Sequence, residues 1–271
     1  MRGGNRRRFL PDTNRSGRRN RSVLQPHPLS QYRFLPGIEP YSCGVVAEPG
    51  WRMERVSLPE WLPWREGFEF VDAFLARRGL PRQALCAMEL RSPAPFPMNG
   101  FIDFNRGYCD LLKAWGLLVN GQNPVARTNV VPLDAPPAEV VLHAFTVVRP
   151  SPTPHRPTFI VAGAGELRDA RLEARGIVRS GDLSAEALRE KCDYVLSVME
   201  DRLRGLGVSW NEVTQTNVYT VHPLEESLRD RLRARLGASS RWGITWNVTR
   251  PPVIDIEFEM DLHGLTSDAP I

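Results

Sequence analysis

The stretch NPVARTNVVPLDAPPAE, residues 123–139, places Arg127 inside an apolar run that has the composition of a buried strand. Burying an unpaired charge is costly, so this arginine requires an anion beside it. A guanidinium presents a rigid fork of donors that holds a carboxylate through two hydrogen bonds. We therefore expect Arg127 to bind the carboxylate of a small substrate. The alternative is a structural pair with an acid of this chain or of a neighbouring chain.

A second run, DIEFEMD at residues 255–261, alternates acidic and apolar residues. Because alternate residues of a strand share a face, the run predicts one acidic and one apolar face. The acidic face holds Asp255, Glu257, Glu259 and Asp261, and the apolar face holds Ile256, Phe258 and Met260. A carboxyl in a pocket can act as a general acid or base when burial raises its pKa towards neutrality. A solvated strand face is the more common use of such alternation, and the residues alone leave both interpretations open.

Three other kinds of site are not indicated. Gly163 and Gly165 form G-x-G, but no third glycine and no helix start follow, so we interpret them as a tight exit from a strand rather than a dinucleotide site. Ser42, Ser151 and Ser180 lack the glycines of a G-x-S-x-G nucleophile turn. The four cysteines have no C-x-x-C spacing and no histidines at ligand spacing, so we expect neither a disulfide framework nor a bound metal.

The composition is that of a globular protein, with 42% hydrophobic and 24% charged residues in a chain of 271. No apolar stretch approaches the roughly 18 residues that a membrane-spanning helix needs. The N-terminus also lacks the apolar segment of a secretory signal. We therefore expect a cytoplasmic protein without a membrane partner.

The positive net charge comes from the N-terminus. Residues 1–22 contain eight arginines and one acid, which leaves 27 of the 35 basic and 30 of the 31 acidic residues for the rest of the chain. The segment has no apolar periodicity and cannot bury enough surface to offset its chain entropy, so we expect a disordered arginine-rich tail over residues 1–30. We expect an idle extension, of the kind that an upstream start codon adds, rather than a nucleic-acid-binding arm or a targeting peptide. We therefore expect no nucleic-acid partner.

The expected elements repeat along the chain. In each half an amphipathic helix ends at a glycine, and a strand-like segment follows at residues 79–93 and 207–221. A second helix, at 101–117 and 224–236, precedes a strand that ends in a double proline. The proline-rich segment at 149–157 separates the copies as a linker. The order strand, helix, strand, helix, strand thus occurs twice, which predicts an α+β fold.

Four segments carry a resemblance to a known family: IEPYSCGVV (38–46), ARTNVVPLDAPPAEVVLHAF (126–145), residues 180–221 and NVTRPPVIDIEFEMDL (247–262). They resemble RidA/YjgF-type domains, once in each half. The resemblance implies two tandem RidA/YjgF-like (chorismate mutase-like) domains, each a mixed β-sheet with two helices packed on one face. The implied parts are a tail (1–30), a first domain (31–150), a linker (151–157), a second domain (158–265) and a tail (266–271).

The resemblance also assigns roles to residues. The family's carboxylate-binding arginine falls on Arg127, and its tyrosine near the start of the domain falls on Tyr41. The family's glutamate, which handles the water or the leaving ammonia, falls on Glu257. Asn129 stands where many members carry cysteine and keeps the site polar, because its amide both donates and accepts. Asn217, on an expected central strand, is a further candidate for substrate binding.

Each half keeps only part of this set. Trp242 stands at the arginine position of the second repeat, and Leu142 lies near the glutamate position of the first. Because family sites lie between subunits, we expect Arg127 of one repeat to face Glu257 of the other.

The implied protein is a homotrimeric hydrolase without metal or organic cofactor. Members of the family convert reactive enamines and imines to ketones and ammonia, and relatives deaminate 2-aminomuconate in aromatic catabolism. The resemblance therefore implies a deaminase of a small carboxylated enamine or imine. Two alternatives stay open: a chorismatase-like hydrolase of a carboxylated ring, and a non-catalytic ligand-binding or structural member of the family.

Overall fold

The computed structural model describes residues 23–152, 156–168, 174–265 and 268–269. Residues 1–22 of the expected N-terminal tail lie outside the described residues, as do parts of the expected linker and C-terminal tail. The described parts of both tails contain strands, namely β1 (Gln25–Pro26) and β13 (Asp268–Ala269). Each pairs with a neighbouring strand, so the ordered fold extends into both segments that we expected to be tails.

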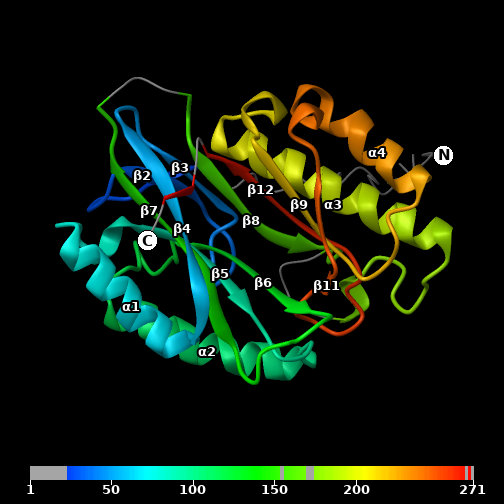
Figure 1. Ribbon diagram of the computed structural model, residues 1–271, viewed down its shortest axis with the longest axis horizontal. Coiled ribbons are helices and arrows are strands. Elements are labelled where there is room, and N and C mark those ends of the chain that lie inside the picture. The colour runs from blue at the N-terminus through cyan, green and yellow to red at the C-terminus, as the bar shows by residue number, and fades with distance from the viewer. Residues whose placement is uncertain (1–22, 153–155, 169–173, 266–267, 270–271) are drawn as a thin grey trace, which may run out of the picture.

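Two sheets form the fold, and each carries two helices (Figure 1). The six-stranded sheet has the order β11-β6-β5-β7-β4-β13. Its other strands are β4 (Trp51–Pro63), β5 (Leu85–Arg91), β6 (Ala126–Pro132), β7 (Val141–Pro150) and β11 (Thr249–Arg250). Helices α1 (Trp64–Arg77) and α2 (Met98–Ala114) pack on this sheet through an apolar cluster that includes Phe68, Leu112 and Phe145.

The seven-stranded sheet has the order β1-β2-β3-β8-β12-β9-β10. Its other strands are β2 (Tyr32–Leu35), β3 (Gly44–Ala47), β8 (Phe159–Gly165), β9 (Gln215–Tyr219), β10 (Thr245–Asn247) and β12 (Glu259–Gly264). Helices α3 (Ala185–Leu206) and α4 (Glu226–Leu236) cover it through a second cluster that includes Leu196, Leu232 and Met260.

The helices begin and end where local sequence favours it. At the start of α3, the Ser184 hydroxyl accepts a hydrogen bond from the Ala187 N–H at 3.2 Å, and Gly207 closes the helix with a φ of 76°. Short 3-10 helices lie at Arg82–Ala84, Ala174–Gly176, Trp210–Glu212 and Gly237–Trp242. Within the described ranges, no helix is long and apolar enough to cross a membrane.

Four strands follow the same order in both sheets, β6-β5-β7-β4 in one and β10-β9-β12-β8 in the other. In each sheet a helix connects two parallel neighbours, α2 between β5 and β6 and α4 between β9 and β10. The expected α+β class is confirmed. The halves also exchange strands, because β2 and β3 extend the sheet of β8 while β11 pairs with β6. The expected domains 31–150 and 158–265 therefore do not coincide with the sheets, and the two-domain layout stays a prediction.

The two sheets meet where β6 lies against β8 and β12. Thr128 on β6 donates its hydroxyl to Oδ2 of Asp261 at 2.7 Å and accepts the Gly163 N–H at 3.1 Å. The Ser42 N–H donates to the Val125 carbonyl at 2.9 Å and so ties the segment before β3 to β6. This junction brings segments from both halves of the chain together and frames a cavity.

The acidic run at 255–261 forms a strand only in its second half, which corrects the expected alternation. Strand β12 begins at Glu259, and Asp255 has a left-handed backbone with a φ of 70°. Ahead of the strand, Glu166 accepts the N–H groups of Glu257 and Phe258 at 2.7 and 3.0 Å. Because the Glu166 side chain accepts hydrogen bonds from both N–H groups, these groups are not available to a neighbouring strand. A loop therefore forms in place of the first half of the expected strand.

Candidate active site

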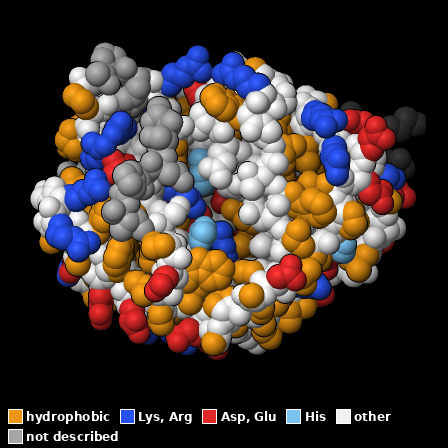
Figure 2. All heavy atoms as spheres, in the orientation of Figure 1, with side chains coloured by type: hydrophobic (Ala, Val, Ile, Leu, Met, Phe, Trp, Pro, Cys, Tyr) orange, Lys and Arg blue, Asp and Glu red, His pale blue; other side chains and the backbone are white. Residues whose placement is uncertain are grey.

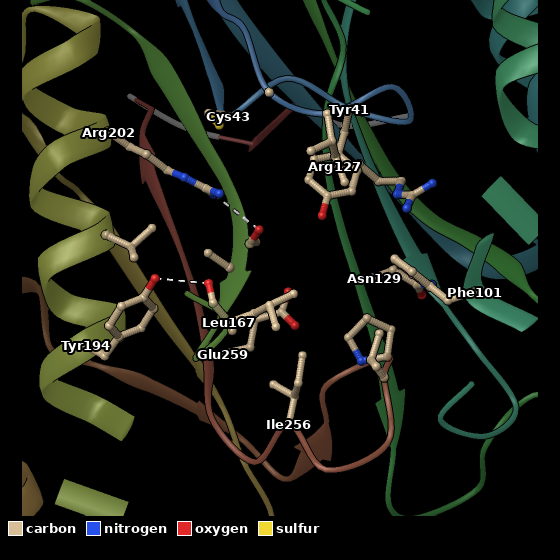
Figure 3. A pocket seen from close by; sticks show the side chains of 18 of the residues that line it. Tyr41, Cys43, Phe101, Arg127, Asn129, Leu167, Tyr194, Arg202, Ile256 and Glu259 are labelled. Atoms are coloured by element: carbon tan, nitrogen blue, oxygen red, sulfur yellow. Dashed lines mark hydrogen bonds between the residues drawn. The ribbon is translucent and has the colours of Figure 1, made fainter. Parts of the chain in front are cut away.

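A cavity of about 310 Å³ lies at the junction of the two sheets (Figure 3). Its walls come from the segment between β2 and β3, from β6, β8 and β12, from α2 and α3, and from the loop before β12. Three residues on one face of α3, at spacings of four, contribute one wall: Tyr194, Val198 and Arg202. The cavity therefore combines residues from both halves of one chain.

Arg127 lines this cavity from β6 and is 3% exposed. Its Nη2 donates to Oδ1 of Asn105 at 2.7 Å, whereas its buried Nη1 has no hydrogen-bond partner in the part of the chain that the structure describes. Among the described residues no carboxylate lies within ion-pair distance of this guanidinium. Burial lowers the pKa of Arg127, an effect that nearby Tyr108 and Tyr41 oppose. The expected unneutralised cation beside a cavity is thus present.

Aromatic rings surround the guanidinium. Its Cζ lies 4.7 Å from the ring centre of Tyr108 and 5.0 Å from that of Tyr41, with Phe101 and Phe104 at 5.7 and 5.8 Å. Such rings stabilise a desolvated cation through their negative faces. Three of them stand on α2, and sequence reasoning missed this contribution because it treated residues 101–117 only as the second helix of the first repeat.

Glu259 is the carboxyl in the cavity, and it is 5% exposed. Burial and, to a lesser extent, the neighbouring Asp261 raise its pKa to about 8, although Arg202 and Arg127 oppose the shift. A Cβ at position 163 would lie 2.2 Å from Oε1 of Glu259, so Gly163 makes room for the carboxyl. Gly163, the first glycine of the G-x-G pair, thus lies within β8 and allows the Glu259 side chain to approach the backbone closely. It does not form the strand exit that we expected.

Glu257 does not line the cavity, which corrects its expected place opposite Arg127. Its Oε2 lies 2.8 Å from Nε2 of His222, at the partly exposed edge of the molecule. The start of β12 at Glu259 explains the difference, because the two glutamates do not share a strand face. Sequence reasoning named Glu259 among the four acids but assigned the role of the family's glutamate to Glu257.

Two other expected site residues line the cavity and one does not. Tyr41 contributes its ring, and burial raises the pKa of its hydroxyl. Asn129 accepts a hydrogen bond from Ser92 at 3.0 Å, and its buried Nδ2 finds no partner among the residues that the structure describes. Asn217 lies behind the cavity wall, where its amide donates to Oδ1 of Asp261 at 2.7 Å.

Asp261 belongs to a polar seam between the sheets. It accepts three hydrogen bonds from uncharged side chains, those of Thr128, Asn217 and Tyr219, at 2.7, 2.7 and 3.0 Å.

A buried ion pair lies on the other sheet. On β5, Glu89 accepts two hydrogen bonds from Arg55, at 2.6 and 2.8 Å. Figure 2 shows histidine and basic side chains in a hollow between the two halves of this face.

Arg202 was missed altogether. It extends from α3, and its Nη1 donates to the carbonyls of Ala162 and Gly163 on β8 at 2.8 and 3.2 Å. Its position four residues after Val198 and eight after Tyr194 was a signal in the sequence, since that spacing aligns one helix face. Over the described part of the chain, no group of three or more His, Cys, Asp or Glu side chains could hold a metal.

A buried carboxyl that keeps its proton beside an unneutralised guanidinium is typical of an enzyme site. A family model described as 2-aminomuconate deaminase CnbZ matches residues 24–269. The chain therefore belongs to the 2-aminomuconate deaminase CnbZ family of enzymes. This membership confirms the aminomuconate-deaminase part of the resemblance seen in the sequence.

One similar protein is the 2-amino-5-chloromuconate deaminase of Comamonas testosteroni, 41% identical over 235 residues, or 86% of this chain and 93% of that protein. Among solved structures, a chorismatase covers 82% of this chain and 77% of its own at 15% identity and a TM-score of 0.47. The YjgF gene product of E. coli covers 41% and 81% at 13% identity and a TM-score of 0.24. The wider likeness to RidA/YjgF domains stays a prediction.

Proposed function

We propose that this protein hydrolyses a small carboxylated enamine or imine of the 2-aminomuconate kind and releases ammonia. The observation that carries the proposal is the pairing, in one cavity, of the unneutralised Arg127 with the proton-bearing Glu259. The relative named 2-amino-5-chloromuconate deaminase supports the substrate class. No feature of the cavity favours hydrolysis of a chorismate-like ring instead.

Arg127 anchors the substrate carboxylate next to the carbon that carries nitrogen. Its Nη1 is the donor that the protein leaves unused, and a carboxylate there would neutralise a cation that is already desolvated. Both effects favour binding, because charge-assisted hydrogen bonds are strong where water is excluded.

Glu259 carries the protons. Its carboxyl protonates the enamine carbon, which yields an iminium ion and an ionised Glu259. The carboxylate takes a proton from water as the water adds to the iminium carbon, and the resulting carbinolamine receives that proton on nitrogen. Ammonia leaves, the carbinol proton returns to Glu259, and a ketone remains. A pKa of about 8 suits both roles at neutral pH.

Tyr41 and Asn129 position the reacting groups in this scheme. The Asn129 Nδ2 is buried and unpartnered, and it donates to the oxygen that water supplies. The Tyr41 hydroxyl closes the cavity over the substrate. Asn217 acts indirectly through Asp261. We further propose that the enzyme works without a cofactor, as a cytoplasmic homotrimer.

The test is ammonia release from freshly prepared 2-aminomuconate. Arg127→Lys should lower kcat/KM by about 30-fold or more, because a lysine cannot replace the fork of donors at a desolvated site. Its melting temperature should stay close to that of the parent protein. Arg106→Lys on the exposed side of α2, where Arg106 pairs with Asp103 at 3.2 Å, is the matched control.

No ammonia from the parent protein would refute the deaminase. Full activity of Arg127→Lys would remove Arg127 from the mechanism. A large fall in melting temperature would mark Arg127 as structural.

A further inference from the structure

The cavity holds a second guanidinium that the proposed mechanism leaves unused. Arg202 reaches the cavity from α3, on the side away from β6 and Arg127 (Figure 3). Its Nη1 is held by the carbonyls of Ala162 and Gly163, which are uncharged. Within the described ranges, no acid forms an ion pair with Arg202, and no group accepts a hydrogen bond from its Nε or Nη2.

The two carbonyls fix the orientation of this cation. They occupy one end of the guanidinium fork, so the edge formed by Nε and Nη2 stays available to a ligand. A planar fork that is held in this way loses little conformational freedom when it binds a carboxylate. Arg202 therefore has the geometry of a prepared anion site.

The charges of the lining side chains also favour an anionic ligand. The charged side chains among its described lining residues are Arg127, Arg202 and Glu259. Glu259 keeps its proton at neutral pH, so the empty site carries two positive charges. A monocarboxylate neutralises only one of them. A dicarboxylate neutralises both.

Glu259 lines the same cavity as the two cations, which belong to different walls, Arg127 to β6 and Arg202 to α3. Both guanidiniums oppose the rise in the pKa of its carboxyl, Arg202 more strongly than Arg127. A substrate whose reacting carbon lies at Glu259 therefore has a cation on either side. We infer that Arg202 binds a second carboxylate at the far end of the substrate and makes the site selective for dicarboxylates.

This inference rests on the proposed function for the placing of the reacting carbon, but its test needs no turnover. Muconate and sorbate share a six-carbon diene skeleton, and sorbate carries a methyl group where muconate has its second carboxylate. Neither has an amino group to lose. Calorimetric titration of the full chain with each compound isolates the contribution of the second carboxylate.

We expect the parent protein to bind muconate at least about 10-fold more tightly than sorbate, as a charge-assisted pair requires. Arg202→Gln should remove this preference and leave sorbate affinity unchanged, which also shows that the cavity is intact. Arg202→Lys should keep part of the preference. Arg204→Gln, two residues along α3 where Arg204 pairs with Asp201 at 2.7 Å on the surface, should keep all of it.

Two results would overturn the assignment: no preference for muconate in the parent protein, or an undiminished preference in Arg202→Gln. Ammonia release by the parent protein together with such a result would leave the deaminase standing and remove only the role of Arg202. A muconate preference that depends on Arg202, without ammonia release by the parent protein, would support the role of Arg202 and refute the deaminase.

Discussion

At the scale of single residues, the cavity contains one buried cation and one buried acid, and neither has an ion-pair partner among the described residues. Arg127 is buried among aromatic rings, and Glu259 is buried beside Gly163, where any larger residue would displace its carboxyl. Such burial costs stability, because both groups would be better solvated in the unfolded chain. On the proposed function, a substrate carboxylate would offset the cost at Arg127, in keeping with the trade-off between stability and activity at functional sites.

The buried carboxyl of Glu259 makes the free energy of unfolding depend on pH. The pKa of Glu259 is raised from its ordinary value of 4.5 to about 8 in the folded protein, so the native state holds a proton that the unfolded state releases above pH 4.5. Its contribution to stability is therefore present at low pH and is lost as pH rises through this window. Glu259→Gln should raise the melting temperature relative to the parent protein at pH 9 more than at pH 5.

Thermal denaturation across this pH range measures the difference. Glu257→Gln, which removes a carboxyl outside the cavity, is the control for the loss of an acid as such. An equal effect of Glu259→Gln at both pH values would contradict the raised pKa.

At the scale of elements, the placing of Glu259 depends on what precedes β12. Lys191 on α3 is fully buried and donates to Glu166 at 3.0 Å and to the Val178 carbonyl at 2.8 Å. Glu166 in turn accepts the backbone N–H groups of Glu257 and Phe258. One buried ion pair thus joins α3 to the loop that sets where β12 begins.

Removing one partner of that ion pair should lower the free energy of unfolding strongly. Lys191→Met leaves the Glu166 carboxylate buried without its cation, and the free energy of unfolding should fall by about 3–5 kcal/mol. Urea denaturation measures the change. The double variant Lys191→Met/Glu166→Gln should recover part of the loss, since no charge is then left unpaired. A single variant as stable as the parent protein would show that the pair does not hold the loop.

At the scale of the whole molecule, each half of the chain contributes strands to the sheet of the other half. The seven-stranded sheet takes β2 and β3 from the first half, and the six-stranded sheet takes β11 from the second. A fragment of residues 158–265 would leave the β8 edge unpaired, and unpaired edges are prone to association.

We therefore expect fragments 31–150 and 158–265 not to fold cooperatively alone and to gain a cooperative thermal transition when mixed. Circular dichroism during heating reports the transition, with the full chain as reference. Two fragments that each melt cooperatively by themselves would instead establish the independent domains that the repeated sequence suggested.

The sequence by itself determined the helices, the α+β class and the burial of the Arg127 charge in an apolar strand. Each follows from local information: apolar stripes at helical spacing, glycine after a helix, and a charge in an apolar run that needs an anion. These signals involve residues that are neighbours in the chain, so they can be read without the fold.

Only the tertiary structure decided which acid lines the same cavity as Arg127, that Arg202 lines it too, and which strands belong to which sheet. The start of β12 depends on Glu166, 91 residues before Glu257, and the junction of the sheets depends on the bond between Thr128 and Asp261, 133 residues apart. A shift of one or two residues in where a strand begins changes which side chain reaches a cavity, and contacts between distant segments set that start. Local patterns contain no information about such contacts.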